Sequence, residues 1–464
     1  MKNIATLPVT LLISWMFTAC TTPPSTPKLA MDVPAAFKES GLWKVVRPDA
    51  ATVPDDWWRL FNDPVLNNLQ QQVIVGNENL KASAAQVQVA RAALGSSRAG
   101  LLPTLGASAG GTRGSTSGNV SVATSYSLAA NASWELDLWG RVAGNVNSAQ
   151  AKVQANEADL AAARLSVQAT LTQTYFSLRT AELQAALLAR SVAAYQRSLD
   201  LTQNRYTAGV ASAAEVAQAQ TQLKSTQGQL VEANSSRAQL EHALATLLGQ
   251  PASSFNLARV NALPAPPDVP VLLPANLMER RPDIAAASAR VAAANAQIGV
   301  AQAAYFPALT LSGGAGYRGP ALADLISAPN LFWSIGPALA LTLFDGGARQ
   351  SAKDSAQASA DQATATYRQT VLTALQEVED NLVIAASLQE EFALQADALK
   401  AAERSLEITT NQYKAGTVSY LNVVTAQATA LSVERTLLDV RNRRLGATTQ
   451  LLKNLGGRWD AAKS

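Results

Sequence analysis

Three stretches of the chain alternate hydrophobic and polar residues one by one, which is the pattern of a β-strand with one apolar face. Over residues 120–138, most even positions hold Val, Leu, Ala or an aromatic residue, whereas most odd positions hold Ser, Ala or Asn. Residues 309–317 and 334–343 alternate in the same way. Such strands are typical of a membrane β-barrel, although a half-buried soluble sheet alternates too. The pattern predicts β-hairpins at about 103–139 and 307–345.

The apolar period changes to seven residues after each predicted hairpin. Seven-residue spacing sustained over several heptads indicates a long coiled-coil helix. We expect helices at about 142–206 and 348–413, and the first would be about 98 Å long at 1.5 Å per residue. A buried helix of a large bundle is the alternative, but it does not explain the hairpins. The residues at this spacing are Leu171, Leu178, Ala185, Val192, Leu199 and Tyr206, and then Val371, Val378, Ala385, Phe392, Leu399, Leu406 and Tyr413.

Each predicted long helix ends in nearly the same short sequence, "NRYTAGVAS" in the first case and "NQYKAGTVS" in the second. Gly209 and Gly416 occupy matching positions, and glycine permits the positive φ that a reversal after a helix commonly needs. We therefore expect the chain to turn back at both glycines. The return helices are predicted at about 212–248 and 419–455.

Most of the chain consists of two copies of one sequence repeat. Pro103 matches Pro307, and from the long helices onward the two copies remain in step to the end. Each copy opens with a helix of good helix formers that stops at one of these prolines. We predict a first repeat at 79–250, a Pro-rich connector at 251–274, a second repeat at 275–457 and a C-terminal tail at 458–464.

The number of predicted strands has a consequence for assembly. The two repeats supply four strands, and about eight is the smallest number that closes a barrel. The missing strands must then come from other copies of the chain. We expect a mainly α-helical fold with a membrane β-barrel contribution, built by an oligomer.

The N-terminus has the features of a bacterial signal peptide, predicted at 1–19. A charged start at Lys2 precedes an apolar stretch too short to span a bilayer. Cys20 is the only cysteine, so it cannot form an internal disulfide. "FTAC" resembles a lipobox, with Phe17 where Leu is usual, and this predicts a covalent lipid on Cys20. A chance cysteine in an ordinary signal peptide is the alternative.

Composition excludes several classes of function. The net charge is only +3, so no nucleic-acid surface is indicated, and no long apolar run follows the signal peptide. The single His242 has no partner for a metal site. Glu135 and Asp137 could pair for catalysis, but small polar neighbours favour a lumen-facing role. Trp57 and Trp58 are expected to be packing anchors rather than a ligand cage. With no nucleotide motif, we expect a passive protein and not an enzyme.

Several motifs together resemble one family, the TolC-like outer-membrane factors, and in particular their lipoprotein (OprM/NodT-like) branch. The resemblance covers nearly the whole mature chain. The motifs are "PDDWWRLFNDPVLNNL", "ERRPDI", "YFPALTLSGGAG", "LTLFDGGAR", the two Tyr-x-Ala-Gly turns and "LGGRW".

This resemblance implies a homotrimer with one twelve-stranded barrel in the outer membrane and a periplasmic helical tunnel closed at its tip. Residues 20–78 would be a lipid tether and an equatorial segment. It further implies the exit duct of a tripartite efflux system, with a periplasmic adaptor and an inner-membrane, proton-driven pump, exporting drugs or other toxic small molecules. No cofactor is expected. A non-porous, lipid-anchored scaffold that spans the periplasm is one alternative, and a duct for metal ions or proteins is another.

The resemblance also implies a gate at the tunnel tip. In this family, links between the two helical hairpins hold the tip shut, and the matching residues here are Tyr413 and Glu215. A hydrogen bond from the tyrosine hydroxyl to the carboxylate would be charge-assisted. Asn422 and Thr425 match the family's rings of aspartate, but neither is charged. The alternative for Tyr413 is that it is only the last apolar step of the seven-residue series.

The two predicted turns are the exposed loops at the far ends of the long helices. We therefore expect the adaptor to dock there, helix tip against helix tip. The docking residues would be Gly209, Val210, Gly416 and Thr417.

Overall fold

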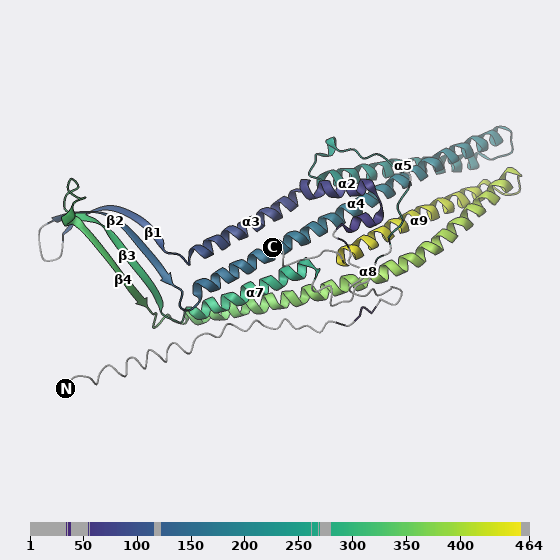
Figure 1. Ribbon diagram of the computed structural model, residues 1–464. Helices are drawn as coiled ribbons and strands as arrows, with labels where there is room; N and C mark the ends of the chain where they lie inside the picture. The colour runs from purple at the N-terminus through teal and green to yellow at the C-terminus, as the bar shows by residue number, and fades with distance from the viewer. Residues whose placement is uncertain are drawn as a thin grey trace. The chain divides into compact units, whose positions relative to one another are not determined.

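The structure is a computed structural model (Figure 1). It describes residues 56–115, 122–260 and 280–455, together with residues 34, 36–38, 54, 262–267 and 269. The predicted signal peptide, Cys20 and the C-terminal tail lie outside the described residues. Two compact units divide the chain, and each unit takes segments from both repeats.

The first unit contains Ala85–Glu157 and Ala286–Gln369 and holds one four-stranded antiparallel sheet in the order β1-β2-β3-β4. The prediction of four strands in two hairpins is confirmed. A short 3₁₀ turn, η4 (Ala328–Asn330), precedes the last strand. The strands are β1 (Thr104–Ser115), β2 (Val122–Leu136), β3 (Ala308–Gly319) and β4 (Leu331–Ala340).

The last strand is shorter than the alternation of the sequence suggests. Ala340 pairs with Ala308, the first residue of β3, so no ladder partner remains for the residues beyond it. Pro307 precedes that pair and has no N–H to donate. Leu341 and Leu343 therefore continue the apolar pattern without belonging to the strand.

One face of the sheet is apolar and exposed. The register places Leu128 opposite Tyr317 and Trp134 opposite Leu311, and residues directly opposite each other lie on the same face. The predicted alternation of faces is thus confirmed. The most exposed of these side chains are Leu105 (83%), Trp333 (72%), Ile335 (69%) and Leu339 (67%).

The opposite face of the sheet carries mostly small and polar side chains, with Phe332 opposite Gly316 as an exception. A side chain at Gly316 would place its Cβ 2.2 Å from the carbonyl oxygen of Leu128, so the strands leave no room for one. Two cross-strand rows contain only Gly, Ser, Thr and Asn, and they are Gly106–Asn131–Gly314–Ser334 and Thr104–Ser133–Ser312–Gly336.

Each hairpin passes into a long helix through an aspartate. Asp137 accepts hydrogen bonds from the backbone N–H groups of Val142 (3.0 Å) and Ala143 (2.7 Å) at the start of α4 (Arg141–Thr207). Asp345 does the same for α8 (Ala348–Lys414), accepting from Arg349 N at 3.2 Å. Asp137 lies after the end of β2, so the expected lumen-facing strand position is wrong for this residue, which satisfies a helix N-terminus instead.

The long helices match their predicted bounds, 142–206 and 348–413, to within one residue at each end. α4 runs over Arg141–Thr207 and α8 over Ala348–Lys414. No described helix is both long enough and apolar enough to cross a bilayer. The other helices are α2 (Pro64–Gly76), α3 (Glu78–Ala99), α5 (Ala213–Leu247), α7 (Pro282–Ala303) and α9 (Tyr420–Leu455), with the short turns η2 (Trp57–Phe61) and η3 (Ala252–Ser254).

The second unit contains Asp32–Ala84, Ala158–Ala285 and the chain from Thr370 onward. Its main hydrophobic core joins the N-terminal segment to the long helices. Trp57 is completely buried there and Trp58 is 7% exposed, which agrees with their expected role as packing anchors. The two indole rings meet edge to face with their centroids 5.9 Å apart. Phe61 and Phe176 belong to the same core, and their ring centroids are 4.9 Å apart.

A buried ion network ties α4 and α5 to the connector that follows α5. The Glu182 carboxylate is 1% exposed and accepts from Arg179 Nη1 at 2.9 Å and Arg237 Nε at 3.3 Å. Arg179 Nη1 also donates to the carbonyl oxygen of Ala258 at 2.6 Å. The backbone N–H of Val260 adds a further hydrogen bond to Glu182 at 3.2 Å. The start of the Pro-rich connector is thus held by charged groups away from water.

Candidate functional site

The two predicted turns have the same geometry, and both belong to the second unit. Gly209 has φ of +73° and Gly416 has φ of +80°, which confirms the expected positive φ. Val210 N–H donates to the Arg205 carbonyl (2.8 Å), as Thr417 N–H donates to the Gln412 carbonyl (3.0 Å). This six-to-one bond, with a left-handed glycine before it, is a Schellman motif that closes a helix.

The turn residues predicted to dock a partner are all exposed, and the side chain of Val210 is 65% exposed. No atom lies within 4 Å of a Cβ built at either glycine. The two turns therefore present open surface within the single chain. Their common backbone geometry accounts for the glycine at the same position of both turn sequences.

The return helix of the first hairpin begins with a capping box. The Ser212 hydroxyl accepts from the Glu215 N–H at 3.3 Å, and Glu215 Oε2 accepts from the Ser212 N–H at 3.0 Å. The other carboxylate oxygen of Glu215 accepts from the backbone N–H of Tyr420 at 3.4 Å. Glu215 thus caps its own helix and reaches the first residue of α9 in the second hairpin.

The predicted hydrogen bond from Tyr413 to Glu215 is not formed, and that prediction is wrong for this structure. Tyr413 is 3% exposed and packs with Ala219, Tyr420 and Val423, and its hydroxyl has no hydrogen-bond partner among the described residues. The seven-residue series directs this ring inward, while the carboxylate of Glu215 is engaged in capping. The alternative interpretation of Tyr413 as the last apolar step of the series describes its contacts better.

Arg205 is a contact residue of this site that the sequence analysis missed. Its guanidinium carbon lies 4.7 Å from the centroid of the Tyr413 ring, and its Nη1 donates to the Tyr413 carbonyl oxygen at 3.2 Å. A difference between the two turn sequences could have pointed to Arg205, since the matching position holds the neutral Gln412. The Tyr420 ring lies 5.4 Å from Tyr413, and burial raises the pKa of Tyr420 to about 12.

Asn422 and Thr425 lie one turn apart near the start of α9, and both are exposed. The Thr425 hydroxyl donates to the Leu421 carbonyl at 3.0 Å. The pair therefore offers a neutral surface rather than a ring of charge. Whether it lines a constriction stays a prediction.

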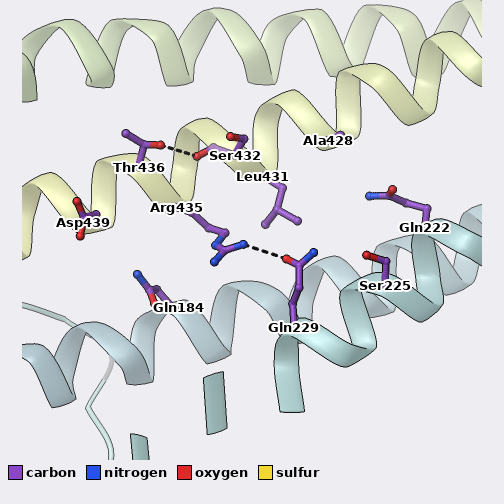
Figure 2. Close-up of a pocket in the computed structure, with 10 residues that line it drawn as sticks. All are labelled: Gln184, Gln222, Ser225, Gln229, Ala428, Leu431, Ser432, Arg435, Thr436 and Asp439. Carbon is purple, nitrogen blue, oxygen red and sulfur yellow. Dashed lines mark hydrogen bonds between the residues drawn. The ribbon is translucent and has the colours of Figure 1, made fainter. Parts of the chain in front are cut away.

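A polar groove of 560 Å³ separates the two helical hairpins farther from the turns (Figure 2). Arg435 of α9 reaches across it, donating from Nη1 to Gln229 Oε1 of α5 at 3.0 Å. Its lining is rich in amides, including Gln184 and Gln222. No group of three His, Cys, Asp or Glu residues in the described part of the chain could hold a metal ion. His242 is exposed.

A family model described as "Outer membrane efflux protein" matches residues 69–250 and 273–457 of this chain. The two matched ranges lie on either side of the Pro-rich connector. Most of the chain is therefore accounted for by one family.

Two curated relatives and one solved structure agree with this match. The chain is 30% identical over 475 residues to the pyoverdine export outer membrane protein OpmQ of Pseudomonas aeruginosa, covering 99% of this chain and 98% of OpmQ. It is 30% identical over 420 residues to the antibiotic efflux pump outer membrane protein ArpC of Pseudomonas putida, covering 89% and 87%. The outer-membrane channel OprN has 29% sequence identity and a TM-score of 0.88, over 95% of this chain and 99% of OprN.

Proposed function

This chain belongs to the outer membrane efflux protein family and forms an exit duct of the outer membrane, and we propose that it works as a passive homotrimer that exports small toxic compounds. Three copies would supply twelve strands, enough to close one barrel. A periplasmic adaptor and a proton-driven inner-membrane pump would deliver the cargo. Energy would come from the pump, since the channel needs none of its own.

The exposed apolar face of the sheet is the observation that carries this proposal. Leu105, Trp333 and Ile335 are each more than two thirds exposed in the single chain. Exposed apolar area of this kind is unfavourable in water and suits the hydrocarbon of a bilayer. In the described part of the chain, the outer edges of β1 and β4 have no partner strand, and other copies would pair with them. A non-porous scaffold in the periplasm would have no use for either feature.

The cargo is proposed as small organic molecules, drugs among them. OpmQ and ArpC are named for pyoverdine export and antibiotic efflux, and this chain is 30% identical to each of them. Sequence identity at this level therefore does not select a cargo, and specificity would lie in the partner pump. Ducts for metal ions or proteins are the alternatives within transport.

A covalent lipid on Cys20 is proposed as a second membrane attachment. The support is the lipobox-like "FTAC" and the "TTPPSTP" stretch behind it. No other bound group is part of the proposal. An acylated N-terminal peptide in the mass spectrum of the mature protein is the expected result.

The helix turns are proposed as the adaptor contact and the tunnel gate. Gly209, Val210, Gly416 and Thr417 would meet the adaptor, in keeping with their exposure. The gate would lie close by, at Tyr413, Glu215, Asn422 and Thr425.

Neighbouring residues of β4 provide a test of the duct. Ile335 points to the apolar face and Ser334 to the small polar face. Ile335→Arg should reduce insertion, because Arg on a lipid face costs about 2–4 kcal/mol at the bilayer midplane. Ser334→Arg should insert normally and change conductance in planar bilayers. A wild-type protein that stays monomeric and never conducts ions would instead support the scaffold.

A further inference from the structure

We propose that Arg205 is the positioning residue that holds the end of the second long helix against the first and so favours the closed state of the tip. This rests on the proposed gate. Its guanidinium carbon lies 4.7 Å from the Tyr413 ring centroid, and Nη1 donates to the Tyr413 carbonyl at 3.2 Å. Arg205 is in the last turn of α4, and Tyr413 is in the last turn of α8. Arg205 therefore joins the two hairpins at their ends, where Glu215 also accepts a longer hydrogen bond from the Tyr420 N–H at 3.4 Å.

The face of the Tyr413 ring, and not its hydroxyl, makes this contact. The hydroxyl is buried without a hydrogen-bond partner in the described part of the chain. A cation over an aromatic face is attracted by the ring quadrupole, and the attraction grows when water is excluded. Tyr413 is 3% exposed, so the ring itself is largely desolvated.

The contact has no counterpart in the other hairpin. Gln412 occupies the position that matches Arg205, and Tyr206 occupies the position that matches Tyr413. Tyr206 is 45% exposed. Of these two matching pairs, only Arg205 and Tyr413 join a cation to a buried ring, so a side chain of α4 holds the end of α8.

Other polar contacts between the hairpins should hold them less firmly. Arg190 and Glu434 form an ion pair of 2.9 Å, but their side chains are 66% and 33% exposed. Exposed pairs of this kind contribute little. Gln427 donates to Ser198 at 3.1 Å, which is a neutral bond. Arg205 combines a charged donor with a buried ring, and it does so at the tip.

The turn backbone connects this contact to the exposed loops. The carbonyl of Tyr413 that accepts from Arg205 also accepts from the N–H of Gly416 at 3.0 Å. The carbonyl of Arg205 accepts from the N–H of Val210 at 2.8 Å. A partner that displaces either turn would therefore move one half of the Arg205–Tyr413 contact directly.

Four variants test the inference in planar bilayers. Arg205→Met and Tyr413→Leu should each raise the open-to-closed ratio of the tip about tenfold, as expected for the loss of a partly desolvated cation–π contact. Tyr413→Phe should leave the ratio unchanged, because the ring is kept. Arg197→Met is the matched control, since it removes an exposed charge from the same helix. The open-to-closed ratio of the double variant Arg205→Met/Tyr413→Leu should be close to that of each single variant, because both substitutions remove the same contact.

Amide hydrogen exchange at the end of α8 gives a second measurement that does not need a conducting channel. Exchange there should rise about tenfold in Arg205→Met and stay at the wild-type rate in Tyr413→Phe. The inference is overturned if Arg205→Met behaves as wild type in both measurements, or if Tyr413→Phe opens the tip as much. A wild-type protein that never conducts would refute the duct, and the exchange data would still decide the role of Arg205.

Discussion

At the scale of single residues, loss of the Glu182 side chain should lower the stability of the protein clearly. It is 1% exposed and accepts from Arg179 and Arg237, which are 2% and 11% exposed. Glu182→Ala would leave two guanidinium groups without their shared carboxylate. Breaking a buried pair in this way costs about 3–5 kcal/mol. Thermal unfolding of the purified protein, followed by circular dichroism, should show a clear drop in the midpoint.

Glu407→Ala is the matched control for this prediction. Glu407 pairs with Arg404 at 2.8 Å, but both side chains are more than half exposed. Its loss should cost no more than about 1 kcal/mol. Equal midpoints for the two variants would contradict the importance assigned to the buried network.

The sequence supports predictions about a residue whose conformation is set by its sequence neighbours. It does not support predictions about contacts between residues that are far apart in the chain. The positive φ of Gly209 follows from a short turn sequence, so it could be predicted. The neighbours of the Tyr413 side chain depend on how the end of α8 packs against the other helices. The Glu215 carboxylate accepts from the Ser212 N–H in a capping box and does not bind Tyr413. Arg205 reaches a residue 208 positions away, which no local pattern reveals.

At the scale of elements, the two turns offer a test of adaptor docking. The glycines themselves are poor probes, because any side chain at a φ of +73° or +80° strains the backbone. Val210 and Thr417 are their neighbours, are exposed and have no such constraint. Val210→Trp and Thr417→Trp should abolish drug export in cells while leaving the trimer intact on a gel, because a bulky ring would prevent close approach of a partner.

Thr221→Trp provides the comparison for these variants. Thr221 is exposed on α5, beyond the turn. The Thr221→Trp variant should export drugs at the wild-type rate. Normal export by both turn variants would exclude docking at the tips, whereas loss of export by Thr221→Trp would mean that bulk anywhere on the hairpin is harmful.

The extent of the elements was largely predictable. Seven-residue and two-residue periods repeat many times within each long helix and strand, so a single exception does not hide them. The ends were harder, because they depend on partners. β4 ends at Ala340, which pairs with the first residue of β3, and Asp137 lies beyond the end of β2 and caps α4. Neither event is visible in the alternation of the sequence.

At the scale of the whole molecule, a lipid-facing sheet predicts which tryptophans meet acyl chains. Trp333 is 72% exposed on the apolar face, whereas Trp57 is completely buried. Brominated lipids quench indole fluorescence only on contact. Trp333→Phe should therefore remove a large part of the quenchable emission, and Trp57→Phe should remove none. Equal losses from the two variants, or no quenching in the wild type, would argue against a bilayer around this face.

Assembly lies partly beyond what one chain's sequence specifies. Four strands with an apolar face imply more copies, because the edge strands β1 and β4 have no partner strand among the residues that the structure describes. The number of copies came from the resemblance to a family and not from periodicity. The residues that set it would lie at contacts between chains, and these are made only in the assembly.

The small side chains on the other face of the sheet also govern how long a passing molecule would remain there. The row Gly106–Asn131–Gly314–Ser334 offers neither a charge nor a large apolar surface. Residence time rises about tenfold for every 1.4 kcal/mol of binding free energy, so weak contacts mean brief stays. Molecules of very different chemistry would then leave at similar rates, and the flux would be limited by supply rather than by release.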